Sequence, residues 1–205
     1  MHFYCQGQNE IERYNSLGDW NSDTLYFHKI LNENFEGGVD GFYNEIFSEI
    51  EYPSVANKNC KEGVALVYLT IEDSKQTIKI LNEIGHLFED EIRKVFNVIE
   101  NSWLQNKNKI ELNVSIRFTI NPHKENSEQE KATIEIIAYQ MGEGLIFDVP
   151  CDYRTTEYLK ELVDNALKYQ DYESAILYLK ELKRRYPFNK DYQKLHDESW
   201  RKIEE

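Results

Sequence analysis

The chain has 205 residues, of which 40% are hydrophobic and 30% are charged, and its formal net charge is −13. This length suits one good core or two small ones, and no apolar run reaches the ~20 residues of a membrane-spanning helix. Without such a run we expect no direct membrane insertion. The negative charge disfavours nucleic acid and anionic lipid headgroups, because these are bound through clusters of Lys and Arg, so we expect a protein or peptide as partner.

The first residues, Met-His-Phe-Tyr-Cys-Gln-Gly-Gln, contain no basic region and only a short apolar stretch. They fit the remnant of a signal peptide, and they fit a frayed cytoplasmic N-terminus equally well. We expect residues 1–33 to form an N-terminal segment that also contains a short strand.

Helical and strand patterns alternate over residues 34–150. Two helices are predicted from apolar residues at helical spacing, over residues 39–50 and 87–103. Dense apolar or alternating runs predict strands over residues 64–71, 77–80, 110–120, 132–139 and 145–149. The region is therefore expected to be an α+β domain in which a small antiparallel sheet packs with two helices.

Several landmarks follow one another in this region: Phe35-Glu36-Gly37-Gly38, Tyr52-Pro53, Glu62-Gly63-Val64, Trp103 at the end of a helix, and the long alternating strand over 110–120. In this order and spacing they resemble the C-terminal domain of TonB, in the form common in Bacteroidetes. The glycines Gly37, Gly38 and Gly63 are expected to adopt backbone shapes closed to other residues. The chain departs from the family at Ser74, where the first hairpin turn usually has glycine, and at Leu104-Gln105-Asn106, which replace a Pro-Gly.

The resemblance implies binding of a short peptide by strand addition in the cell envelope or periplasm. The candidate docking edge is the strand over 110–120, with Leu112, Val114, Ile116 and Phe118. In an alternative reading, residues 132–139 fold back and cover that edge. The protein would then be a structural or assembly protein that self-associates through its C-terminal helices.

Residues 155–205 resemble one tetratricopeptide repeat with a capping helix, with helices predicted over 158–169, 172–186 and 189–203. A single repeat needs further packing partners, because stable arrays generally contain about three. A groove for an acidic peptide terminus is predicted at the following tail residues: Tyr158, Tyr169, Tyr172, Lys183 and Arg184. Alternatively, the tyrosines belong to the core and the basic residues complement the helix dipole.

The cysteines Cys5, Cys60 and Cys151 show no metal-ligand spacing, and whether Cys60 pairs with Cys151 stays open at this point. Cys60, His86 and Asp90 are the one combination with the residue types of a nucleophile, a base and an orienting group, and nothing in their spacing predicts contact. We therefore expect a non-enzymatic protein without a metal or an organic cofactor.

Overall fold

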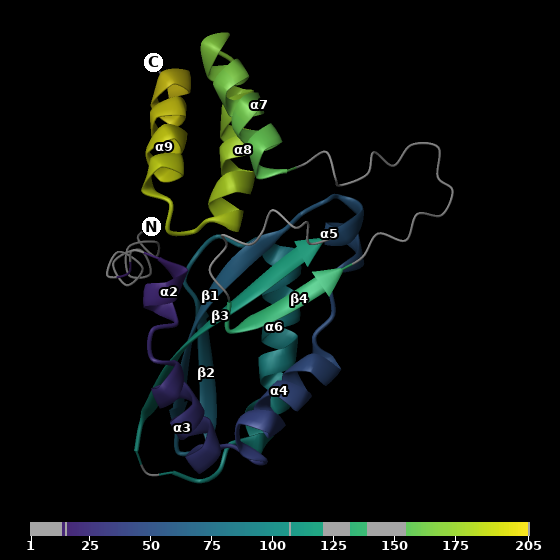
Figure 1. The fold of residues 1–205 in the computed structure, drawn as a ribbon, viewed down its shortest axis with the longest axis vertical. Helices are drawn as coiled ribbons and strands as arrows, with labels where there is room; N and C mark the ends of the chain where they lie inside the picture. The colour runs from purple at the N-terminus through teal and green to yellow at the C-terminus, as the bar shows by residue number, and fades with distance from the viewer. Residues whose placement is uncertain (1–13, 15, 107, 121–131, 139–154, 205) are drawn as a thin grey trace.

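The structure is a computed structural model that describes residue 14 and residues 16–106, 108–120, 132–138 and 155–204. Its centre is a four-stranded sheet, with helices on both faces and a separate group of three helices at one end (Figure 1). The predicted strand over 145–149 lies outside the described residues.

The strands are β1 (Gly63–Glu72), β2 (Lys75–Ile80), β3 (Ile110–Ile120) and β4 (Ile134–Ala138), in the spatial order β2-β1-β3-β4. β1 pairs antiparallel with β2 and β3, whereas β4 runs parallel to β3. The predicted α+β class is confirmed, but the sheet is mixed and not wholly antiparallel. A parallel neighbour requires a long connection, and residues 121–133 are numerous enough to provide it.

The main core lies between one face of the sheet and the helices α4 (Gly38–Glu49) and α6 (His86–Ile99). The alternation in β3 explains this layer, because every second side chain from Ile110 to Phe118 enters the core while the residues between them face the other side. Trp103, after the short 3-10 turn Glu100–Ser102, packs edge-on against Phe35 with ring centroids 4.9 Å apart.

Two helices precede this layer, α2 (Leu17–Trp20) and α3 (Thr24–Asn34). Each begins after a polar cap: Ser16 accepts from the N–H of Asp19, and Asp23 accepts from the N–H of Tyr26. The short strand predicted within residues 1–33 is not found at residue 14 or in residues 16–33, since helices occupy most of this stretch. A further short helix, α5 (Ser54–Lys58), leads into β1.

A second, smaller core covers the opposite face of the sheet. It consists of side chains from α2, β1 and the segment after β2, namely Leu17, Trp20, Val64, Leu66 and Leu81. Phe188, from the turn between two tail helices, packs against it, and its ring centroid lies 6.4 Å from that of Trp20. The C-terminal part of the chain is thus in contact with α2 through this turn.

The tail comprises α7 (Thr156–Lys168), α8 (Tyr172–Arg185) and α9 (Lys190–Glu204), which share a small core of their own. The three predicted helices are confirmed to within two residues at each end. Their core is formed by Leu159, Val163, Ala166, Ala175, Leu179 and Leu182. Ala166 of α7 and Ala175 of α8 both belong to this core, where their small side chains allow the two helices to pack closely.

Glu62, just before β1, joins the tail to the sheet. Its backbone carbonyl accepts a hydrogen bond from Arg184, its carboxylate lies 3.1 Å from Arg185, and the same carboxylate accepts from the N–H of Ile120 at 2.7 Å. Both arginines also pair with Glu181 on α8. The ends of β1, β3 and α8 therefore meet at one carboxylate.

The backbone conformation predicted for three glycines is found at two of them, Gly37 and Gly38, and not at Gly63. Gly37 and Gly38 have φ of +74° and +64°, as expected of positions that favour glycine. Gly63 does not have a positive φ; a Cβ there would instead lie 2.5 Å from side-chain atoms of Arg184 and Ile84. Gly63 is thus required by close packing, and the role predicted for it was wrong.

In the described residues, no helix is long and apolar enough to cross a membrane.

Candidate functional site

The strand β3 is paired on both sides over only half of its length. β4 pairs with residues 116–120, from Ile116 opposite Ile134 to Ile120 opposite Ala138. One residue earlier, the N–H of Ser115 donates to the Thr133 hydroxyl at 3.2 Å. Beside residues 110–114, no strand in the described part of the chain occupies this side.

The backbone groups on the open side belong to Glu111 and Asn113. N–H and C=O groups of successive strand residues point to opposite sides, and Ser115 points toward Thr133. Glu111 and Asn113 therefore also point outward, whereas Leu112 and Val114 point toward β1, with which they pair. Among the described residues, up to four backbone groups along the open half of β3 thus have no hydrogen-bond partner.

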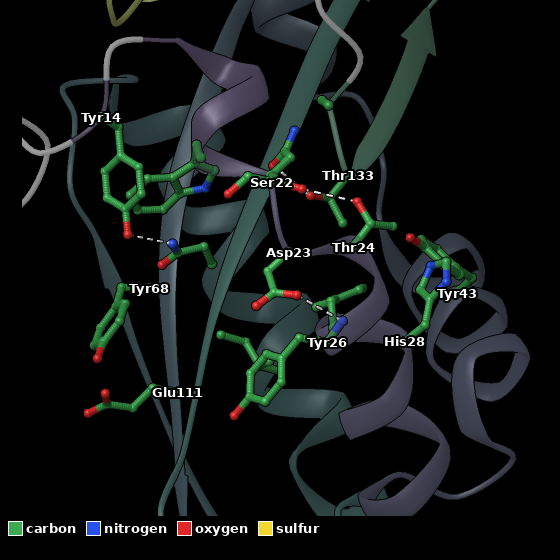
Figure 2. A pocket seen from close by; sticks show the side chains of 16 residues that line it. Tyr14, Ser22, Asp23, Thr24, Tyr26, His28, Tyr43, Tyr68, Glu111 and Thr133 are labelled. Atoms are coloured by element: carbon green, nitrogen blue, oxygen red, sulfur yellow. Dashed lines mark hydrogen bonds between the residues drawn. The ribbon is translucent and has the colours of Figure 1, made fainter.

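A groove of about 770 Å³ follows this open half, and Figure 2 shows it from close by. On the side of β3 it is lined by residues from both faces of the sheet: Tyr68, Glu111 and Asn113 from one face, and Leu112 from the other. The start of α3 and Tyr43 of α4 form the opposite wall. The groove therefore wraps around the strand edge.

The end of the groove nearest β4 is fixed by a polar cluster. Ser115 Oγ donates to Asn21 Oδ1 at 2.8 Å, and Thr133 Oγ1 donates to the same oxygen at 3.1 Å. Asn21 follows α2 directly, so the cluster ties this helix to β3 and to the residue before β4. At the outer face, Asn113 Nδ2 donates to the Tyr14 hydroxyl at 2.8 Å.

Those lining residues that the structure describes include two carboxylates, Asp23 and Glu111, and neither Lys nor Arg. A hydrogen bond from Lys109 is the main cause that lowers the pKa of Glu111, and a hydrogen bond from Tyr68 is the second. This carboxylate is therefore charged at neutral pH. Asp23 Oδ1 accepts from the N–H of Tyr26 at 3.0 Å. Burial raises the pKa of Tyr43, which keeps this side chain neutral.

The four predicted edge residues are placed differently from the prediction. Leu112, Val114, Ile116 and Phe118 have side chains at most 3% exposed, in the core between the sheet and the helices. Ile116 and Phe118 are excluded from docking, because β4 already covers their half of the strand. The open groups belong to Glu111 and Asn113, which alternate with the predicted residues.

The tail residues predicted to form a groove do not come together. Tyr172 and Arg184 stand at opposite ends of α8, roughly 18 Å apart along its axis. Tyr158 lies in the first turn of α7, and Tyr169 follows the last residue of this helix, where it is 75% exposed. Arg184 binds the Glu62 carbonyl at the joint with the sheet, and burial lowers the pKa of Lys183. The predicted basic rim is therefore used mainly within the molecule.

The wall of the groove over residues 20–28 was not anticipated from sequence. The signal was available, because Ser16 and Asp23 are preferred N-cap residues and each precedes a run with apolar side chains. Nothing in that run, however, indicates that its helix lies beside a strand almost ninety residues later.

Cys60 is disulfide-bonded and therefore supplies no thiolate for catalysis. Cys5 and Cys151 lie outside the described residues, so whether Cys60 pairs with Cys151 stays open. His86 and Asp90 are one turn apart on α6. No group of three or more His, Cys, Asp or Glu side chains suited to a metal ion occurs within residues 14, 16–106, 108–120, 132–138 and 155–204.

No family model, no curated protein and no solved structure matches this chain. The resemblance to the TonB C-terminal domain and to a tetratricopeptide repeat thus stays a prediction from residue order.

Proposed function

We propose that the protein is a non-enzymatic binding module that holds a short peptide as an added strand along the open half of β3, as its resemblance to TonB C-terminal domains implies. The groove is the main support for this proposal, because it reaches both faces of the sheet and follows a strand edge that no other strand of the described residues pairs with. An added strand would pair with Glu111 and Asn113 and send its side chains alternately to the two faces.

The opposite edge of the sheet, β2, is less suited to this role. It carries Lys75 and Lys79, and lysines on an edge strand discourage pairing with another chain. The outward N–H of Gln76 is also occupied, since it donates to the Glu100 carboxylate at 3.2 Å. The open half of β3 is therefore the better docking edge.

The arrangement limits the length of the peptide. Residues 110–114 span roughly 17 Å at ~3.3 Å per residue. Thr133 and β4 block further pairing at the C-terminal end of this stretch. We therefore expect pairing over about five residues, which suits a short extended segment better than a long strand.

Backbone amide exchange tests the proposal, with a capped seven-residue peptide of alternating valine and threonine as the probe. In the free protein, the amides of Glu111 and Asn113 should exchange quickly, whereas those of Leu112 and Val114 should be protected by β1. Saturating peptide should slow the two outward amides at least tenfold. If the peptide leaves both amides unchanged, strand addition at this edge is wrong.

Two substitutions at Asn113 distinguish the contribution of its backbone N–H to peptide binding from that of its side chain. Asn113→Pro removes the outward N–H and should abolish peptide binding, because proline cannot donate to a strand ladder. Asn113→Ala keeps the N–H and loses only the bond to Tyr14, so it should bind. Circular dichroism verifies that both variants fold, and the exchange experiment on the wild-type protein stands independently of them.

We also propose that the protein acts in the cell envelope. The disulfide at Cys60 supports this, because disulfides persist in oxidising compartments and are rare in the cytosol. Thiol trapping in intact cells tests it: Cys60 should resist alkylation until a reductant is added, and immediate alkylation contradicts the proposal.

A second candidate function is self-association through the tail. Large apolar side chains of the tail are exposed to solvent, among them Leu177, which is 66% exposed, and Trp200, which is 43% exposed. Sedimentation velocity over a hundredfold concentration range distinguishes the candidates. A dimer that Leu177→Ser dissociates favours assembly, whereas a monomer at all concentrations contradicts it.

A further inference from the structure

The groove offers charges of one sign next to aromatic rings. Its lining includes two carboxylates, Asp23 and Glu111, and the rings of Tyr14, Tyr26 and Tyr68. Lys109 pairs with Glu111 from outside the groove lining and does not enter it. The aspartate uses Oδ1 to cap α3, and within the described residues its Oδ2 has no hydrogen-bond partner.

The geometry of strand addition assigns these groups to particular peptide positions. Side chains of an added strand alternate between the faces of the sheet, in step with those of β3. A residue opposite Glu111 lies on the outer face with Tyr68. The next peptide residue lies opposite Leu112, on the side of the buried Phe27.

We infer that the peptide taken by this groove alternates cationic and apolar side chains, with Lys or Arg opposite Glu111 and an apolar residue opposite Leu112. This inference rests on the proposed function and names the chemistry of its ligand. An opposite charge directly across a strand pair is favourable, and an ammonium or guanidinium group is also attracted by tyrosine rings.

The charge of the whole chain acts in the same direction. With a formal net charge of −13, the protein attracts a cationic peptide over distances longer than a contact. This long-range attraction is screened at a Debye length of about 10 Å in 0.1 M salt. Affinity for a cationic peptide should therefore fall with salt, and the local preference for a cation opposite Glu111 should persist.

Three capped seven-residue peptides test the inference by calorimetric titration of the full-length protein. Valine alternates with lysine in the first, with threonine in the second and with glutamate in the third. We expect the lysine peptide to bind at least tenfold more tightly than the glutamate peptide at 0.15 M salt, with the threonine peptide between them.

The outcomes separate this inference from the proposed function. Equal affinity for all three peptides, or the reverse order, overturns the cationic preference but leaves strand addition standing. Failure of all three to bind overturns the proposed function and the inference with it. Tight binding that leaves the amides of Glu111 and Asn113 unprotected places the cationic site elsewhere and overturns both.

A matched pair of variants assigns the preference to one carboxylate. Glu111→Gln keeps the shape of the side chain and should reduce the ratio of lysine to glutamate affinity roughly three- to fivefold. Glu161→Gln removes the same charge from an exposed position on α7, far from the groove, and should leave the ratio unchanged. An equal effect of both variants would show that net charge alone sets the preference.

Discussion

At the scale of single residues, Gly63 marks a close contact between the helical tail and the sheet. An added Cβ would lie 2.5 Å from Arg184 Cγ and from Ile84 Cδ1. We predict that Gly63→Ala lowers the free energy of unfolding by about 1–3 kcal/mol, because the neighbouring side chains must move. Urea denaturation measures this loss.

The double variant Gly63→Ala/Arg184→Ala tests whether contact with Arg184 causes this loss of stability. Arg184→Ala removes Cγ from the crowded site, so Gly63→Ala should cost less in that background than in the wild-type protein. A non-additive cycle is expected for residues in contact. Strictly additive effects of the two substitutions would contradict packing against Arg184 as the reason for glycine.

His196 gives the tail a dependence on pH. It is buried on α9, its Nε2 has no hydrogen-bond partner in the described residues, and it faces Lys180 and Lys183 of α8 and the adjacent Asp197. Burial is the main cause that lowers its pKa below the usual 6.5, so the unfolded chain binds a proton first as the pH falls.

We predict that the stabilisation from neutral His196 is complete above pH 6.5 and is lost as the pH falls through that value toward the lower folded-state pKa. Urea denaturation between pH 8 and pH 5 should show a smaller loss of stability for His196→Gln than for the wild-type protein. Parallel curves for the two proteins would rule out this contribution.

At the scale of elements, the turn between β1 and β2 is the clearest site for a stabilising change. Asp73 and Ser74 have φ of +50° and +65°, and the register places Glu72 opposite Lys75 across a two-residue turn. Such turns favour glycine at the second position, and Ser74 Oγ is buried without a hydrogen-bond partner among the described atoms.

We predict that Ser74→Gly raises the free energy of unfolding by roughly 0.5–1 kcal/mol, because it relieves a left-handed backbone that costs other residues about that much. Thermal and urea denaturation measure the gain. Ser54→Gly, at the start of α5, is the control and should not stabilise, since glycine weakens helices. A destabilised Ser74→Gly variant would contradict the strain at this turn.

Most elements could be predicted from sequence because their patterns are local. The alternation from Ile110 to Ile120 allows only a strand with one buried face, and the spacing of Phe88, Ile92 and Phe96 allows only an amphipathic helix. The direction of β4 could not be predicted, because alternation in Ile134–Ala138 is the same in a parallel and an antiparallel neighbour.

The candidate site was predicted only in part for a similar reason. Sequence indicated β3 as an edge that a peptide or a fourth strand would use, and the structure places β4 on one half and a groove on the other. The apolar residues of β3 stand out in sequence, but the outward groups of Glu111 and Asn113 belong to the backbone. No side-chain pattern distinguishes them.

At the scale of the whole molecule, the disulfide at Cys60 constrains the chain segment that leads into the sheet, since Cys60 lies between α5 and β1. We predict that Cys60→Ser lowers the free energy of unfolding by about 2–4 kcal/mol. Reduction of the wild-type protein should lower it by a similar amount. Peptide mapping without reductant identifies the partner, and three free thiols in the denatured, unreduced protein would contradict a disulfide.

The joint at Glu62 has a mechanical consequence. The tail is attached where β3 ends, and the open edge lies where β3 begins, roughly 23 Å away along the strand from Asn113 to Ile120. Tension between a held peptide and the tail would therefore run along the strands, across hydrogen bonds that lie perpendicular to it. Bonds in this arrangement share a load and fail together, whereas bonds pulled apart from one end of a strand break one after another.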